Sequence, residues 1–441
     1  MTLSIVLQFA VVLAAIWMGS RYSGVGLGLW GAVGLLILVV AFGVNPTSPP
    51  VDVMLIILAV IMAASVMDAA GGIDFLVRIA ERIIRANPKY VTIVAPLTTW
   101  SFTFVAGTGH IVYPLLPVIY ETAHQSGIRP ERPMAVATIA SQQAITASPV
   151  AAATAAMIGL FSEKGLSQWG LPEILMICVP ATLTGVVAAA IVSMFVGKDL
   201  KDDPEYQARL KSGQVPAPKS AEERPPLKAS AKTSAYLFLC GVALVVFFGF
   251  FPEYRKLPGA KGPLAMPIVI EIVMMAVAAI MLLATKINVD EVPKTATLRA
   301  GVVAVIGIFG LAWLGDSFIA AHQNVIVPAI GEWAKAAPWT FAFGLFFASV
   351  LLYSQAATTR ALMPLGMALG IPPQFLIAMF PSVNGYFFIP TYGSLIAAIN
   401  FDLSGTTRIG KYVLNHSFMI PGIVATSVAV ITGLFLARIM F

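Results

Sequence analysis

Long uncharged apolar runs alternate with polar segments along both halves of the chain. Six of these runs are close to the roughly 20 residues that carry an α-helix across about 30 Å of hydrocarbon. They are residues 3–19, 24–44, 51–71, 234–251, 264–285 and 298–320. After the third and the sixth run, apolar positions recur at helical spacing in the amphipathic stretches 74–89 and 322–337. The pattern predicts an all-α polytopic membrane protein.

Composition agrees with this pattern and excludes several classes of protein. Hydrophobic residues make up 58% of the 441 residues and charged residues only 11%, whereas soluble domains carry about 25% charged residues. A water-soluble enzyme is therefore excluded. The two cysteines, Cys178 and Cys240, lie in apolar stretches, which excludes a disulfide framework and a cysteine metal site. The net charge of +6 is not gathered on a basic face with interleaved aromatic residues, so we expect no nucleic-acid partner.

The basic residues predict how the chain is oriented in the membrane. Arg21 follows the first apolar run, and four Lys or Arg residues follow the third run between residues 78 and 89. Because loops rich in Lys and Arg stay in the cytoplasm, the N-terminus is predicted to lie outside. No basic residue precedes the first run, as a signal peptide would require, so we expect that run to be retained as a span.

A charged segment divides the chain into two parts. Residues 197–232 contain eight Lys or Arg and six Asp or Glu among Pro, Ser and Ala. Such a segment has too little apolar surface to order itself, and we expect a cytoplasmic linker between an N-terminal membrane repeat, 1–196, and a C-terminal membrane repeat, 233–441. Since the first repeat starts outside and the second inside, the two are predicted to have inverted topology, as in many secondary transporters.

The later part of each repeat contains two polar stretches, interrupted by Gly or Pro, within hydrophobic sequence. The four stretches are residues 106–117, 141–152, 352–364 and 381–394. Non-helical backbone at membrane depth is tolerated only where protein or a water-filled cavity surrounds it. Paired interruptions in corresponding positions point to a transport site. We therefore expect discontinuous helices and re-entrant hairpins that meet around a substrate.

The chemistry of these stretches suits an anion. Gly107 and Gly109 let a ligand approach the backbone, and a half-helix beginning near His110 would present N–H groups and partial positive charge to it. Hydroxyl and amide groups bind a carboxylate without burying a charge. The predicted substrate-binding residues are Gly107, Thr108, Gly109, His110, Thr146, Ser148, Ser354, Gln355, Thr358, Thr359, Arg360, Asn384, Thr391, Tyr392 and Ser394. We predict no catalytic residues and no metal site, since nucleophile arrangements, metal-ligand spacings and a Walker loop are missing from the sequence.

Two interpretations remain open for each of four ionisable residues. Arg360 suits bidentate binding of a carboxylate, or it lies at a helix end or pairs with an acidic neighbour. His110 either titrates or stays neutral and hydrogen-bonded to backbone. Asp68 and Asp316, at the ends of the third and sixth apolar runs, either couple transport to a cation or cap helices.

Several motifs in and around the breaks carry a family resemblance. They are residues 87–121, GIRPERPM (127–134), AITASPV (144–150), AWLGDSF (312–318), LLYSQAATTRALMP (351–364), IPTYGS (389–394) and DLSGTTRIGKYVLNHSF (402–418). With them the sequence resembles, nearly end to end, the anaerobic C4-dicarboxylate transporters (Dcu type) of bacteria. The resemblance implies a carrier in the cytoplasmic (inner) membrane that exchanges external fumarate, malate or aspartate for internal succinate, or takes up such acids, without a bound cofactor. Some members of that family regulate a membrane sensor kinase, a role the motifs do not assign here.

The leading hypothesis is secondary transport. Moving a net charge through the membrane potential costs about 2.3 kcal/mol per 100 mV, so we expect electroneutral dicarboxylate antiport by alternating access. The alternatives are a symporter of another organic anion coupled to Na⁺ or H⁺, motivated by Asp68 and Asp316, and an anion channel. A membrane enzyme lacks a suitable constellation of residues. The sequence leaves open whether the chain forms a homodimer.

Overall fold

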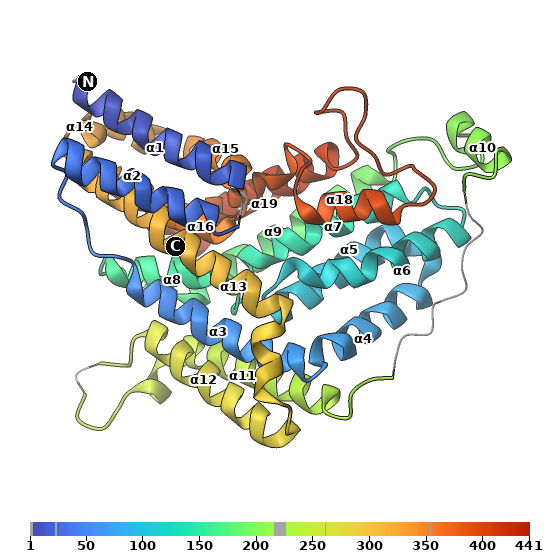
Figure 1. Cartoon of the computed structure of the whole chain (residues 1–441), viewed down its shortest axis with the longest axis horizontal. Helices are drawn as coiled ribbons and strands as arrows, with labels where there is room; N and C mark the ends of the chain where they lie inside the picture. Colours follow the sequence, from blue (N-terminus) through green and yellow to red (C-terminus); the bar gives the residue numbers. More distant parts are fainter. Residues whose placement is uncertain (1–2, 23, 216–225, 261, 353) are drawn as a thin grey trace.

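The computed structural model describes residues 3–22, 24–215, 226–260, 262–352 and 354–441. This part of the chain is built from helices, with an isolated bridge between Ile409 and His416 and no β-sheet in the described ranges (Figure 1). Six of its helical segments are long and apolar enough to span a membrane. They are α3 (Val51–Ala69), α9 (Leu171–Ser193), α11 (Ala231–Phe250), α12 (Met266–Thr285), the run Ala296–His322 and α19 (Met419–Met440). The all-α polytopic prediction is confirmed.

Shorter apolar helices and one amphipathic helix accompany these spans. The first two predicted spans form α1 (Leu3–Tyr22) and α2 (Gly26–Phe42). The amphipathic stretch after the third span forms α4 (Gly72–Ala86), whose buried side chains recur at helical spacing. The second amphipathic prediction, 322–337, is wrong as a separate helix, because α14 continues from Trp313 to Ala336. No Gly or Pro lies between Asp316 and Pro328 to end the helix there.

The predicted breaks interrupt helices in both halves of the chain. In the first half, α5 (Val91–Ala106) turns at Gly107 into α6 (Val112–Gln125), which packs against it, and α7 (Glu131–Gln143) is separated from α8 (Ala152–Glu163). In the second half, α15 (Phe341–Leu352) packs against α16 (Gln355–Ala368), and α17 (Pro373–Met379) is separated from α18 (Gly393–Phe401). The prediction of discontinuous helices is confirmed. The inverted symmetry of the two repeats stays a prediction.

Helices of the two halves pack directly on one another. The span α9 runs beside α19, while α3 packs against α12 and α13 (Ala296–Gly307). One continuous core contains buried side chains from both halves, among them Ile56, Phe161, Phe238 and Phe380. The two predicted repeats are therefore interleaved in space, and the broken helices of one half lie next to those of the other (Figure 1).

Glycines allow one especially close helix crossing. The helix α2 meets the π-helical segment Ile308–Ala312, which joins α13 to α14. A methyl group added to Gly310 would overlap the backbone of Gly28, and one added to Gly31 would overlap the backbone of Gly310. Such contact between backbones replaces the hydrophobic driving force that helices lack within a membrane. The crossing ties the N-terminal helices to the second half.

Replacing Gly310 by Ala should destabilise the protein, because the added methyl group has no room. Overpacking of this kind costs about 1–3 kcal/mol, so we expect a lower thermal unfolding midpoint in detergent for G310A. The matched control is G307A, three residues earlier, where an added methyl group meets nothing within 4 Å. Equal midpoints for the two variants would contradict the close crossing.

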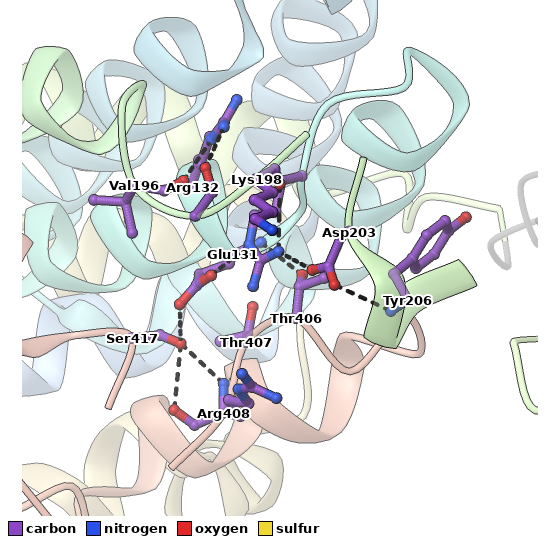
Figure 2. A network of polar contacts seen from close by, with 12 residues as sticks. Glu131, Arg132, Val196, Lys198, Asp203, Tyr206, Thr406, Thr407, Arg408 and Ser417 are labelled. Atoms are coloured by element: carbon purple, nitrogen blue, oxygen red, sulfur yellow. Dashed lines mark hydrogen bonds and ion pairs between the residues drawn. The ribbon is translucent and has the colours of Figure 1, made fainter. Parts of the chain in front are cut away.

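The start of the predicted linker is ordered, which corrects the expectation that this segment cannot fold. Residues Pro204–Lys211 form α10, whose N-terminus is capped by Asp203. Arg129 bonds Glu131 (Nε to Oε2, 2.6 Å) and also pairs with Asp203. Figure 2 shows Glu131 beside Ser417, whose hydroxyl donates to Glu131 at 2.6 Å. Charged contacts and a small apolar cluster of Leu200, Tyr206 and Val215 hold the segment. Residues 216–225 of the linker lie outside the described residues.

The same network joins three separate parts of the chain. Asp199 and Glu205, which flank Asp203, pair with Arg132 and Arg408 at 2.9 and 2.5 Å. The basic partners belong to the start of α7 and to the loop between α18 and α19. Burial raises the pKa of Asp203, but the hydrogen bonds and charge of Arg129 and the backbone N–H groups of α10 outweigh it and hold the pKa below its ordinary value. The linker therefore fastens the two halves together at one end of the molecule.

The substitution D203N should loosen this segment. A charge-assisted hydrogen bond contributes about 1.5–3 kcal/mol, so we expect trypsin to cleave after Lys198, Lys201 or Arg209 roughly tenfold faster in D203N. Because the pKa of Asp203 is lowered on folding, its contribution is present above the ordinary value of about 3.9 and is lost as the pH falls through the native value. The control is D202N, which removes the same charge from an exposed neighbour. Equal cleavage of both variants would contradict the assignment.

Candidate functional site

Two of the breaks end in hydroxyl-capped helix N-termini. The Thr108 hydroxyl accepts a hydrogen bond from the backbone N–H of His110 at 3.3 Å, in the turn that leads into α6. The Ser354 hydroxyl accepts one from the backbone N–H of Ala357 at 3.2 Å and caps α16. Gly107 has a φ of 70°, a conformation that favours glycine. Glycine and the two hydroxyl caps therefore end one helix and begin the next at the positions that the sequence predicted.

Four side-chain amides from three elements meet between these breaks. Gln355, at the start of α16, donates to Gln142 (3.0 Å) and to Asn384 (2.9 Å). Asn384 in turn contacts Gln143 at 3.4 Å, and Gln143 donates to the Thr426 hydroxyl on α19 at 2.8 Å. We call Gln142, Gln143, Gln355 and Asn384 the amide cluster. It joins the end of α7, the start of α16 and the 3₁₀ segment Phe380–Phe387.

The turn at residues 107–109 and the break before α18 lie close to the same cluster. A methyl group on Gly109 would overlap the side chain of Gln142, and one on Gly107 would overlap the backbone of Val150, which precedes α8. Tyr386 and Tyr392 lie 4.8 Å apart between ring centroids, and together with Ser354 and Gln355 they line a small pocket. Tyr392 directly precedes α18. The turns that begin α6, α16 and α18 thus lie at the amide cluster, and the turn before α8 packs against the turn before α6.

Several predicted site hydroxyls bond to backbone instead. Thr146, Thr358 and Thr359 each donate to a carbonyl one turn earlier in their own segment, and Ser148 donates to the carbonyl of Phe104 at 2.6 Å. These bonds satisfy backbone groups around the breaks. Ser394 is fully buried, and its hydroxyl has no hydrogen-bond partner among the described residues. The ring of His110 stacks on Tyr113, with centroids 5.8 Å apart. Thr391 lies in the turn just before α18.

Arg360 does not join the amide cluster. It lies on α16 with only 3% of its side chain exposed, and its Nη2 atom contacts Glu163 at 2.6 Å and Asp316 at 3.2 Å. Of the two interpretations of Arg360, the structure therefore shows pairing with acidic neighbours. Asp68 accepts a hydrogen bond from Thr297 at 2.8 Å, which links α3 to α13.

The amide cluster carries no formal charge. Each amide offers two donors and one acceptor, so the group can rearrange its bonds to donate to a carboxylate. Sequence reasoning missed Gln142, Gln143 and Thr426. The signal for the first two was present, because a Gln pair directly before a break stands out in a helix that otherwise buries mostly small and apolar residues. For Thr426, within a long apolar helix, the sequence offers no comparable signal.

Apolar spans, interrupted helices and a buried polar cluster where the interruptions meet define a membrane transporter. The chain matches the family described as anaerobic C4-dicarboxylate membrane transporters over residues 4–441. It is 42% identical to the C4-dicarboxylate transporter DcuA of Escherichia coli strain K12, over 99% of this chain and 100% of the relative. It is 39% identical to the anaerobic C4-dicarboxylate transporter DcuB of Escherichia coli O6:H1, over 97% of each chain. The chain belongs to the DcuA/DcuB family of anaerobic C4-dicarboxylate transporters.

Two solved structures share the fold at low sequence identity. The YdaH transporter of Alcanivorax borkumensis, described as having an unusual topology, matches with a TM-score of 0.54 and 14% identity, over 92% of this chain and 89% of its own. MtrF of Neisseria gonorrhoeae matches with a TM-score of 0.53 and 12% identity, over 100% of this chain and 95% of its own. These likenesses support the fold alone.

Three predictions are confirmed by these comparisons. The resemblance to Dcu-type transporters is correct, and the relatives are named transporters, not enzymes. Together with the apolar helices they identify a multi-pass protein of the bacterial inner membrane. The protein is thus an anaerobic C4-dicarboxylate transporter of the DcuA/DcuB type.

The substitution Q355L should weaken substrate binding. It removes a side-chain donor at the amide cluster, and losing a hydrogen bond to a charged group costs about 1.5–3 kcal/mol, so we expect a roughly tenfold higher half-saturating concentration of a C4-dicarboxylate. Uptake into membrane vesicles measures this, with protein content normalised by immunoblot. Q125L, at the exposed end of α6, is the control. Normal half-saturation in Q355L would remove the amide cluster from the site.

Proposed function

We propose that the chain exchanges a C4-dicarboxylate such as fumarate or malate for succinate, without net charge movement, and that the substrate binds at the amide cluster. The observation that supports this most is that the N-terminal turns of α6, α16 and α18 meet at uncharged amides. N-termini of helices carry about half a positive charge and exposed N–H donors. A dianion bound there needs no buried counter-charge from the protein.

The substrate has hydrogen-bonding partners ready in this region. The hydroxyls of Tyr386 and Ser394 are buried and have no hydrogen-bond partner among the described residues. Unsatisfied buried hydroxyls are uncommon in folded proteins. A diacid that replaced the bond between Gln355 and Asn384 would reach both the start of α16 and the start of α18. One carboxylate would then bind at the start of α16 and the other at the start of α18.

Exchange follows from the energetics of the membrane. A dianion moving alone against the potential would cost about 4.6 kcal/mol per 100 mV, twice the value for one charge, whereas a second dianion moving the opposite way cancels this work. The alternative, a cation-coupled symporter, would need a carboxylate that is available to the cation. Asp68 accepts a bond from Thr297 and Asp316 pairs with Arg360, which favours structural roles for both.

Liposomes containing the purified full chain test the proposal. Uptake of labelled fumarate should require internal succinate and should not respond to an imposed membrane potential, because the charges of the two dianions cancel. Aspartate carries an additional ammonium group and hence one negative charge less, so its exchange for succinate should respond to the potential. Fumarate uptake that follows a Na⁺ or H⁺ gradient and ignores internal succinate would support the symporter, and uncoupled flux would support a channel.

A further inference from the structure

A cavity of about 840 Å³ lies next to Arg360, away from the amide cluster. It is lined by the segment before α3, the end of α8, the first part of α14 and the second half of α16. Arg360 lies five residues after Gln355 on α16, which is about 7.5 Å along the helix axis. By the positive-inside rule the segment before α3 lies outside, since it is separated from Arg21 by α2. We call this the outer cavity.

The guanidinium of Arg360 is only partly satisfied. Its Nη2 atom holds both acidic partners, while Nε and Nη1 are buried without a hydrogen-bond partner among the described residues. The Asp316 Oδ1 atom is likewise without one. A guanidinium has five N–H donors in a fixed fork that matches a carboxylate. Arg360 therefore lines the cavity, and two of its nitrogen atoms, buried beside it, are donors that the protein does not use.

The two acidic partners differ in how firmly they are held. The Glu163 side chain is 24% exposed and belongs to the last residue of α8, whereas that of Asp316 is 14% exposed and lies within α14. Glu163 can turn toward water with little loss of packing. Asp316 would remain and keep the guanidinium neutralised.

We propose that Arg360 forms a second, outward-facing carboxylate site, in which Glu163 acts as a tethered competitor that the carboxylate of an external diacid displaces. The inference rests on the proposed dicarboxylate function and adds an entry site to the amide cluster. An external diacid first exchanges with Glu163 on Arg360 and then passes along α16 to the amides. No covalent bond forms or breaks in this exchange, because one carboxylate replaces another on the same guanidinium.

The charged residues around the cavity decide how a diacid can bind there. Asp52, Glu163 and Asp316 outnumber Lys164 and Arg360, so a diacid gains no net attraction from the cavity as a whole. Binding must come from a specific partner exchange on Arg360 and not from a general positive field. Removing the competitor should therefore act differently from removing another negative charge of the same cavity.

The test compares E163Q with D52N in liposomes that carry the full chain. Both variants remove one negative charge from the outer cavity, but only Glu163 bonds Arg360. We expect E163Q to lower the half-saturating concentration of external succinate by roughly fivefold, as expected when a charge-assisted competitor is lost. D52N should change it by less than about twofold, as for a charge without a direct bond. The value for internal succinate should stay unchanged in both.

R360K provides an independent second readout. Lysine keeps the charge but loses the planar fork. The half-saturating concentration of external succinate should therefore rise in R360K, while that of internal succinate stays the same. Equal effects of E163Q and D52N, an equal shift on both sides of the membrane, or unchanged external half-saturation in R360K would each overturn the outer site. Absence of dicarboxylate exchange in the wild-type chain would instead overturn the proposed function.

Discussion

The need to satisfy backbone polar groups inside a membrane governs this structure. A helix interrupted in hydrocarbon leaves N–H and C=O groups that lipid cannot bond, and each such group costs several kcal/mol. The chain satisfies them with hydroxyls placed at or near the breaks, as Thr108, Ser148 and Ser354 illustrate. These backbone N–H and C=O groups can be hydrogen-bonded only if the breaks face the interior of the protein. The interruptions of both halves therefore come together, and the amide cluster is a consequence of their burial.

Close helix packing makes that meeting possible. Glycines at Gly107 and Gly109 bring the turn between α5 and α6 against Val150 and Gln142, and Gly185 lies against the backbone of Ala425 where α9 meets α19. Larger residues at these points would hold the elements apart. Since helices in lipid gain little from hydrophobic burial, small residues set which helices become neighbours. The amide cluster depends on this packing, because Thr426 on α19 holds Gln143.

Local signals were visible in the sequence, whereas long-range partners were not. Apolar runs predicted α3, α11 and α12 within a few residues, because length and hydropathy alone decide a span. The positions of the breaks followed from Gly107 and Ser354. The bond between Gln142 and Gln355 joins residues 213 apart, however, and pairings at that distance depend on tertiary packing.

The prediction for the linker was wrong for a different reason. Asp203 followed by Pro204 is a strong helix-start signal, but the sequence interpretation rested on low apolar content alone. Arg129 and Arg408, far away in the chain, pair with Asp203 and Glu205, and Leu200, Tyr206 and Val215 form a small buried cluster. Composition measures what a segment can bury by itself, and it says nothing about the charges that the rest of the fold presents to it.

Two features of α16 connect the outer cavity with the amide cluster. Ser354 fixes the start of the helix beside the amides, and Arg360 fixes its second turn to α8 and α14 through Glu163 and Asp316. A rigid helix cannot move at one of these points without moving at the other. A change of partner at Arg360 leaves the bonds of Gln355 to its amide neighbours in place, because Asp316 still holds the guanidinium. The ion pair and the cluster thus hold two different points of α16, so the start of the helix keeps its place while the proposed outer site exchanges one carboxylate for another.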